Sequence, residues 1–295
     1  MSKTDLSEER RNILSGVGDI IDRYFGVTGI GKTLPHYRHK ESCIKLSKPP
    51  SPEIDMLKVM EDVYKRIKTN WENAARPQEP RSNPGSQQNW RFSLNPVMAE
   101  GNDSLEVQLE RGIARVCMSR PSERDRWANQ VPTASGLVPP HNDKHRNIDL
   151  IHKRREGEYE FIELKVESNT PLYAAIEILL YGLLYVFRRQ EKDSLVTIDE
   201  SEGTKEQRAL LNAALIHLRV LAPSEYYKGY DLAWLEDKIR EGLRQLVGKR
   251  ALSFRMDFEF QHFPTLTTAD LKQGIDDVRI VEELQNRRSV YRRIG

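Results

Sequence analysis

The chain has 295 residues, a formal net charge of +2 and a mean hydropathy of −0.65. This length allows one or two domains. The nearly balanced charge excludes a histone-like polybasic protein, although it leaves room for local basic patches. The two cysteines, Cys43 and Cys117, show no disulfide or zinc spacing, which is typical of a reducing compartment. Since residues 1–11 are charged and lack a signal-peptide pattern, we expect a cytoplasmic protein.

The N-terminal part, residues 1–88, is predicted to be a helical region that ends in a linker. Leu6–Tyr24 and Pro52–Ala75 show helical periodicity. Arg76–Gln88 is rich in Pro, Gly, Ser, Asn and Gln, a composition typical of linkers. A homodimer interface, a partner-docking module and a clamp on substrate are alternative tasks for this region. Residues 89–295 then form the second domain.

The segment Gly26–Thr33 matches the P-loop pattern G-x-x-x-x-G-K-[ST]. A P-loop needs a strand before it and a helix beginning at its lysine, so that backbone N–H groups can cradle phosphates. Here Ile20–Phe25 continues a helical pattern, and Pro35 follows where a helix should propagate. A turn after a helix is therefore the favoured interpretation, and an NTPase ranks third among the functional hypotheses.

The second domain alternates between helical and strand patterns. We predict, in chain order, a helix capped by Asp103 with Glu106 completing a capping box, strands Asn147–Lys153 and Tyr159–Val166, helix Thr170–Arg189, strand Ile216–Ala222, a helix from Asp231 to near Gly248, and strand Leu252–Gln261. This order predicts an α/β fold with a mixed β-sheet flanked by helices. The most apolar run, Leu172–Phe187, is shorter than the roughly 20 residues of a membrane span, so we expect a buried helix and no membrane partner.

The two predicted strands around Gly157 carry charged residues in an apolar setting. Period-two geometry places Glu163 and Lys165 on the same face. A three-residue loop with Gly157 in the left-handed conformation would set Asp149 opposite Glu163. Carboxylates that close repel each other unless a cation or a proton lies between them, and Mg²⁺ prefers such oxygen ligands. A solvated polar face of an edge hairpin is the alternative.

The following helix carries a stripe of polar side chains at a spacing of four, namely Tyr173, Glu177, Tyr181 and Tyr185. Glu177 is expensive to bury unless it is paired. Tyrosine stripes are more often core than site, but the acid inside this one makes a site role for Glu177 and Tyr181 an equal alternative.

The pattern Asp149…Glu163-x-Lys165, together with the order of elements over about Ser104–Phe260, resembles the PD-(D/E)XK nuclease superfamily. The resemblance implies a restriction-endonuclease-like core. It also implies that Asp149 and Glu163 bind Mg²⁺ or Mn²⁺, with the backbone carbonyl of Leu164 as a further ligand. Lys165 would orient and activate the attacking water.

Two further residues match the family less closely. Glu110 looks like the helix glutamate of Holliday-junction-resolvase-like members, with Glu106 as its rival. Glu177-Ile178-Leu179-Leu180-Tyr181 is similar to the Q-x-x-x-Y motif of exonuclease-like members, with Glu in place of Gln. Asn147-Ile148 stands before Asp149 where many members have the proline of "PD".

Basic residues cluster around the hairpin. Arg111–Arg155 contains 10 basic and 4 acidic residues, a net charge of +6. The tail adds Arg287, Arg288, Arg292 and Arg293. Arg146, Lys153 and Arg154 are the candidate nucleic-acid contacts, with a solvated face as the alternative. The histidines near the hairpin, His141, His145 and His152, lack a metal-pair spacing.

The leading hypothesis is a nuclease that hydrolyses phosphodiester bonds of DNA with Mg²⁺ or Mn²⁺, in restriction, repair or defence. The second hypothesis is an inactive nuclease-like domain that binds nucleic acid or protein.

Overall fold

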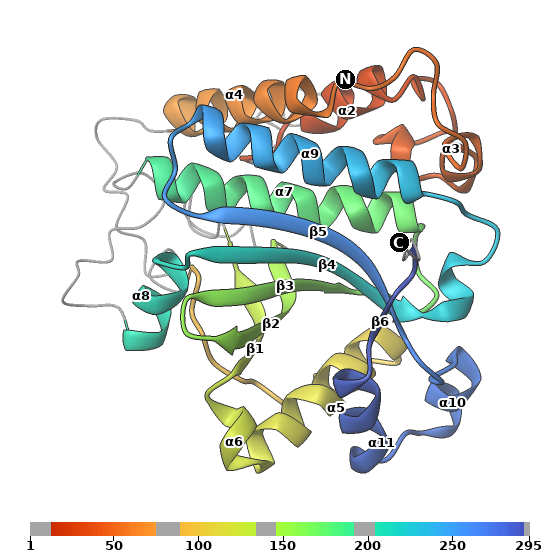
Figure 1. Ribbon diagram of the computed structural model, residues 1–295. Helices are drawn as coiled ribbons and strands as arrows, with labels where there is room; N and C mark the ends of the chain where they lie inside the picture. Colours follow the sequence, from red (N-terminus) through yellow and green to blue (C-terminus); the bar gives the residue numbers. More distant parts are fainter. Residues whose placement is uncertain (1–12, 75–88, 134–145, 192–203, 292–295) are drawn as a thin grey trace.

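The computed structural model describes residues 13–74, 89–133, 146–191 and 204–291 (Figure 1). The predicted linker and the start of the first predicted helix lie outside these ranges. The helices are α2 Val17–Tyr24, α3 Lys40–Lys45, α4 Met56–Ala74, α5 Leu105–Ser119, α6 Pro121–Arg124, α7 Pro171–Gln190, α8 Lys205–Leu211, α9 Ala233–Lys249, α10 Thr268–Gln273 and α11 Asp277–Gln285, with 3₁₀ turns η1 His36–Arg38 and η3 Ser224–Tyr227. The strands are β1 Trp127–Pro132, β2 Asn147–Arg155, β3 Glu158–Leu164, β4 Leu215–Pro223, β5 Arg255–Phe263 and β6 Arg288–Ser289.

The strands form one six-stranded mixed sheet in the order β1-β2-β3-β4-β5-β6. β1, β2 and β3 are antiparallel neighbours, β3, β4 and β5 run parallel, and β6 returns antiparallel to β5. Helices α7 and α9 cover one face, with α2 and α4 outside them, while α5 and α11 lie on the other face (Figure 1). The predicted α/β fold with a mixed sheet flanked by helices is confirmed.

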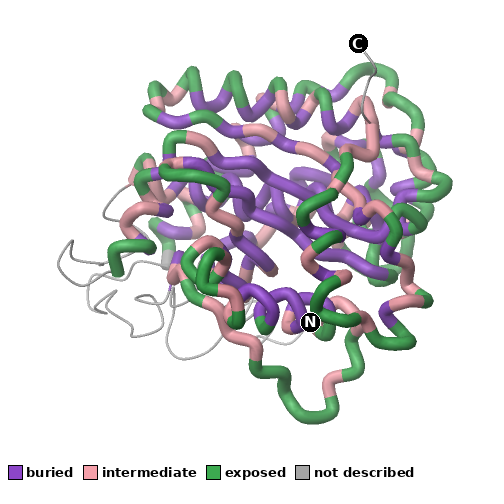
Figure 2. Tube along the Cα trace, turned by 60° about the horizontal axis from the view of Figure 1, so that its bottom comes forward, coloured by how far each residue is buried: buried purple, intermediate pink, exposed green. Residues whose placement is uncertain are grey.

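Helix α7 is the central helix of the core. Thr170 caps it by accepting a hydrogen bond from the Tyr173 N–H at 3.2 Å, and Pro171 occupies the first turn, where its missing N–H costs nothing. The helix is long and apolar enough to cross a membrane, but 83% of its most apolar window is buried between the sheet and the N-terminal helices (Figure 2). It therefore packs as a buried core helix, as its interrupted apolar run predicts.

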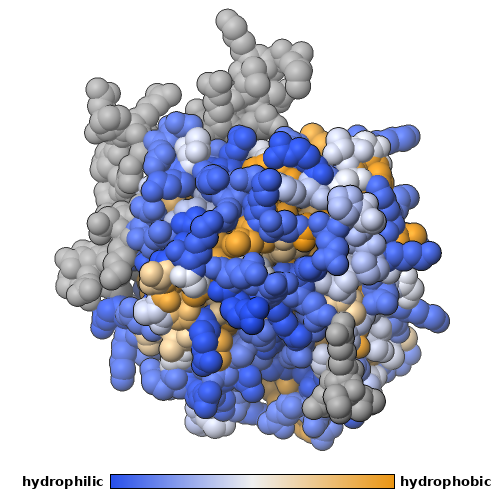
Figure 3. Space-filling view, turned by 45° about the horizontal axis from the view of Figure 1, so that its top comes forward, coloured by the Kyte–Doolittle hydropathy of each residue, from blue (hydrophilic) through white to orange (hydrophobic). Residues whose placement is uncertain are grey.

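The N-terminal helices share this core. Met60, Val63 and Ile67 of α4 are buried with the apolar side chains of α7 and α9, and the Tyr37 ring stacks on Tyr173 at 5.9 Å. On the side of α2, α4 and α9, the outer surface is mostly hydrophilic with small apolar areas (Figure 3). The division at residue 88 and the use of this region as a dimer or partner interface stay predictions.

Two local predictions need correction. Helix α5 is capped by Ser104, which accepts a hydrogen bond from the Val107 N–H at 3.4 Å, so the Asp103 cap is wrong. The capping box is wrong as well, because the Glu106 carboxylate accepts hydrogen bonds from the loop after β3 instead.

The P-loop motif follows a helix, as expected for a turn. Helix α2 precedes Gly26, and only turns and bends occupy residues 26–34 before η1. No strand leads into the motif within this described segment, so the context that a P-loop requires is missing. The interpretation as a turn after a helix is confirmed.

Candidate active site

The hairpin of β2 and β3 sets the register of the site. Leu150 pairs with Ile162, so the next position outward sets Asp149 opposite Glu163. Gly157 has a φ of 71°, in the left-handed region predicted for it. The loop itself differs from the prediction, because Arg155 already pairs with Glu158 after a register shift, which leaves a two-residue turn. The register shift compensates for the shorter loop, so the Asp149 and Glu163 carboxylates still face each other.

Three of the predicted site residues meet an acid from α7. The Lys165 ammonium donates to Glu163 Oε1 at 2.6 Å and to Glu177 Oε2 at 3.2 Å. Asp149 Oδ2 accepts a hydrogen bond from the Leu164 N–H at 2.9 Å. Glu163 and Lys165 are only 3% and 6% exposed. We call Asp149, Glu163, Lys165 and Glu177 the carboxylate–lysine cluster.

The cluster holds more negative than positive charge in a buried place. Burial and the neighbouring Asp149 and Glu177 carboxylates raise the pKa of Glu163. Burial raises the pKa of Asp149 to about 7, although Lys165 and the Leu164 N–H work in the opposite direction. Burial alone would lower the pKa of Lys165, but the carboxylates outweigh it and raise that pKa, so the lysine stays an ammonium.

One atom of the cluster lacks a partner. Glu163 Oε2 is buried and makes no hydrogen bond to the described residues. A hard divalent cation suits it, because Mg²⁺ commonly binds one or two carboxylates and completes its shell with water and substrate oxygens. Asp149 and Glu163 therefore fit Mg²⁺ or Mn²⁺. Among the described residues, however, no group of three or more His, Cys, Asp or Glu side chains is arranged to hold a metal.

The tyrosine stripe of α7 divides between site and core. Tyr181 is 2% exposed, and after burial the Glu163, Glu177 and Asp149 carboxylates are the main causes that raise its pKa. Burial and the Glu177 carboxylate likewise raise the pKa of Tyr173. Tyr185 instead donates to the Leu210 carbonyl at 2.8 Å and packs among aromatic rings. Tyr173 and Tyr181 thus lie beside the cluster, to which Glu177 belongs, whereas Tyr185 belongs to the core.

The two glutamates of α5 have different surroundings. Glu110 is 2% exposed and accepts hydrogen bonds from the side-chain amides of Asn129 and, at 3.0 Å, Gln130. Glu110 affects the cluster only by electrostatic repulsion: its negative charge is the smallest of the main causes that raise the pKa of Asp149. Glu106 accepts hydrogen bonds from the Val166 N–H at 3.0 Å and the Ser168 hydroxyl at 2.7 Å, which fixes the segment after β3.

The predicted nucleic-acid contacts are not all near the cluster. Arg146 is close enough that its charge lowers the pKa of Tyr181 against the larger effects of burial and the carboxylates. Lys153 and Arg154 lie toward the turn of the hairpin, where they pair with Glu156 at 2.6 Å and Glu158 at 3.3 Å. The structure therefore separates them from the cluster. His141, His145, Arg292 and Arg293 lie outside the described residues.

A row of polar side chains across the sheet is absent from the sequence prediction. Trp127, His152, Glu160, His217 and Asp257 are successive Cα partners from β1 to β5. Arginines neutralise the acids of this row: Arg287 lies 2.9 Å from Glu160, and Arg219 lies 3.2 Å from Asp257. The alternation of charged and apolar residues in β5 is a signal in the sequence that one face of this strand is polar. The partners of Asp257 in the row follow only from the register of five strands.

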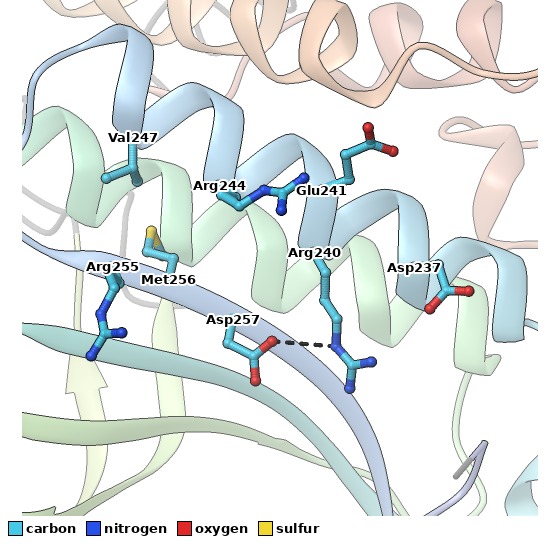
Figure 4. Close-up of a pocket in the computed structure, with 8 residues that line it drawn as sticks. All are labelled: Asp237, Arg240, Glu241, Arg244, Val247, Arg255, Met256 and Asp257. Atoms are coloured by element: carbon cyan, nitrogen blue, oxygen red, sulfur yellow. Dashed lines mark ion pairs between the residues drawn. The ribbon is translucent and has the colours of Figure 1, made fainter. Parts of the chain in front are cut away.

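A pocket of about 410 Å³ lies between α9 and β5, at the end of this row (Figure 4). Its charged side chains balance, with Asp237, Glu241 and Asp257 against Arg240, Arg244 and Arg255. Arg240 Nε lies 3.3 Å from Asp257 Oδ1. None of the four cluster residues lines this pocket.

Comparison of the chain with protein-family models, with curated proteins and with solved structures gives no match.

Proposed function

We propose that the chain is a metal-dependent nuclease that hydrolyses phosphodiester bonds of DNA in the cytoplasm, in restriction, repair or defence. One observation carries the proposal: Asp149 and Glu163 face each other beside an ammonium group, with one buried carboxylate oxygen free of partners among the described residues. That combination suits a cation and an anionic substrate at the same place.

The topology supports the proposal. Helix α5, the β2–β3 hairpin, helix α7, the parallel strand β4, helix α9 and strand β5 follow in this order, with α6, β1, α8 and η3 between them. The order of helix, hairpin, long helix, strand, helix and strand is the one on which the resemblance to PD-(D/E)XK nucleases rests, and β1 is an additional strand that was not predicted. Glu177 and Tyr181 of α7 border the cluster, as expected for residues similar to the Q-x-x-x-Y motif.

The chain's own residues divide the work. Asp149 and Glu163 would hold the divalent cation, and the Leu164 carbonyl remains the predicted third ligand. Bound there, Mg²⁺ or Mn²⁺ would lower the pKa of water and neutralise charge on the scissile phosphate. Lys165 stays protonated beside Glu163, so it acts as a hydrogen-bond donor that orients water or a phosphate oxygen and not as a base. Tyr181, which is 2% exposed, would border the bound substrate from the α7 side.

The test is cleavage of single-stranded, double-stranded and branched DNA with Mg²⁺, Mn²⁺ or EDTA. We expect Asp149→Asn and Glu163→Gln each to reduce the rate by about 10²-fold or more, the order found when one electrostatic stabiliser is removed. Glu156→Gln is the matched control, since Glu156 is an exposed carboxylate of the same hairpin, paired with Lys153. Metal-dependent cleavage that survives both cluster substitutions would sink the proposed site.

The second candidate function is a nuclease-like domain that binds nucleic acid or protein without cleaving. It is favoured by the closed ion pairs of Lys165 and by the lack of a three-carboxylate metal group in the described part of the chain. DNA binding that needs no metal, with no cleavage of any of the substrates, would support it against the first.

A further inference from the structure

A second pocket, of about 370 Å³, lies on the other face of the sheet from α7. We call it the Arg287 pocket. It is lined by Val116, Cys117, Arg120, Glu123, Arg126, Trp127, His152, Arg154, Val281, Leu284, Gln285 and Arg287. These residues come from strands β1 and β2, from helices α5, α6 and α11, which lie together below the sheet in Figure 1, and from the loops next to these elements. The volume is within the usual range for small-molecule sites.

The lining of this pocket is strongly basic. Four arginines, Arg120, Arg126, Arg154 and Arg287, line the pocket with one carboxylate, Glu123. Arg154 and Arg287 also pair with Glu158 and Glu160, which lie outside the lining. The pocket between α9 and β5 has equal numbers of acids and arginines (Figure 4). The excess of arginine therefore distinguishes the Arg287 pocket, and arginine is the side chain best suited to bind phosphate or carboxylate groups.

Two nitrogens of the Arg287 guanidinium are hydrogen-bonded, and the third has no partner among the described residues. Its Nη2 lies 2.9 Å from Glu160 Oε2 and its Nε donates to the Leu284 carbonyl at 2.9 Å. The side chain is 12% exposed. Its Nη1 is buried and has no hydrogen-bond partner among the described residues. A buried donor without a partner is unfavourable, so an anion placed against Nη1 would satisfy it.

The neighbouring side chains narrow the ligand class. The Arg120 guanidinium makes no hydrogen bond or ion pair within the described ranges, so its donors are available. The Trp127 ring is already stacked on His152, with centroids 4.2 Å apart, and the Arg287 guanidinium lies 5.9 Å from its centroid. Both neighbours compete for the faces of the indole, so the pocket offers charge and N–H donors and not a stacking platform.

We infer that the Arg287 pocket binds a phosphate group, held by Arg120 and Arg287. The phosphate belongs either to free phosphate or to a nucleic-acid backbone that extends to this face of the sheet. This site differs from the carboxylate–lysine cluster, whose side chains lie on the α7 face, and it does not depend on the proposed cleavage.

Binding is measured by titration calorimetry in EDTA, with inorganic phosphate in one arm and a single-stranded oligonucleotide in the other. We expect Arg120→Gln and Arg287→Gln to weaken binding by about tenfold or more, the effect of losing one charge-assisted hydrogen bond. Arg120→Gln guards against misfolding, because the Arg120 side chain has no hydrogen-bond or ion-pair partner among the described residues. Arg244→Gln, which removes an arginine from the balanced pocket, is the matched control and should bind as the unchanged protein does.

The two arms separate the sources. Weakening of phosphate binding alone identifies free phosphate as the ligand, and weakening in both arms identifies the nucleic-acid backbone. The inference is overturned if the unchanged protein binds neither probe, if Arg120→Gln and Arg287→Gln bind as tightly as it does, or if Arg244→Gln loses as much. Binding is read without metal and cleavage with it, so failure of the proposed nuclease site and failure of this pocket are separate results.

Discussion

Replacing Lys165 by methionine tests the charge balance of the carboxylate–lysine cluster. The substitution keeps most of the side-chain volume but removes the ammonium that lies 2.6 Å from Glu163 and 3.2 Å from Glu177. Those carboxylates are 4% and 19% exposed, so water cannot take over the role of the lysine fully. Breaking a buried ion pair by removing one partner typically costs about 3–5 kcal/mol. We expect Lys165→Met to lower the free energy of unfolding by roughly 3 kcal/mol at pH 8.

The loss should depend on pH in a defined direction. The pKa of Asp149 is raised from 3.8 to about 7, and that of Glu163 is raised above 4.5. The folded protein therefore holds these protons more tightly than the unfolded chain, and stability falls as the pH rises from about 4 through about 7. Removing the ammonium raises both pKa values further, so the fall becomes steeper. Near pH 5 the carboxylates are largely protonated, and we expect a much smaller loss.

The assay is urea unfolding at pH 5 and pH 8 in EDTA, repeated with Mg²⁺ at pH 8. If the cluster binds a cation, Mg²⁺ should restore part of the lost stability of Lys165→Met. Lys249→Met is the matched control, since Lys249 pairs with Glu61 at 2.6 Å but has a side chain 61% exposed, and exposed pairs contribute about 1 kcal/mol or less. A loss at pH 8 no larger than that of the control, or an equal loss at both pH values, would refute the reasoning.

Three further predictions concern the scaffold. Burial raises the pKa of Glu236 to about 7, so Glu236→Gln should flatten the fall in stability between pH 5 and pH 8, measured by thermal unfolding. Tyr37→Ala should lower the free energy of unfolding in urea by about 3 kcal/mol or more, because it removes the buried ring that stacks on Tyr173. Tyr37→Phe keeps the ring and should lower that free energy far less. Gly182→Ala should cost about 1–3 kcal/mol in the same assay, since its Cβ would lie 2.7 Å from a β4 leucine side chain, while Gly248→Ala, with nothing within 4 Å, should not destabilise.

The features that could be predicted from the sequence depend on local geometry. Asp149 faces Glu163 because both lie on one hairpin whose turn contains a left-handed glycine. Glu177 and Tyr181 share one side of α7 because they are spaced by four residues. Each of these relations involves positions close together in the chain, so periodicity is enough to establish them.

The features that were missed depend on contacts between distant segments. Glu106 was assigned to a capping box three residues long, yet its partners Val166 and Ser168 lie 60 and 62 residues away. Strand β1 carries Asn129, Gln130 and Pro132, which hide its strand character in the sequence, and its pairing with β2 alone makes it a strand. Tertiary partners decide such positions, and no spacing rule supplies them.

Among the described residues, the row across the sheet and the carboxylate–lysine cluster differ in their balance of charge, and this difference separates their roles. In the row across the sheet, burial alone would raise the pKa of Glu160. Arg287, His152 and Arg219 outweigh burial, so the pKa of Glu160 is lowered. That carboxylate is fully compensated and gains nothing from a cation. In the carboxylate–lysine cluster, the pKa values of Asp149 and Glu163 remain raised even beside Lys165. A divalent cation relieves uncompensated negative charge. Metal binding should therefore be sought at the carboxylate–lysine cluster and not at the row across the sheet.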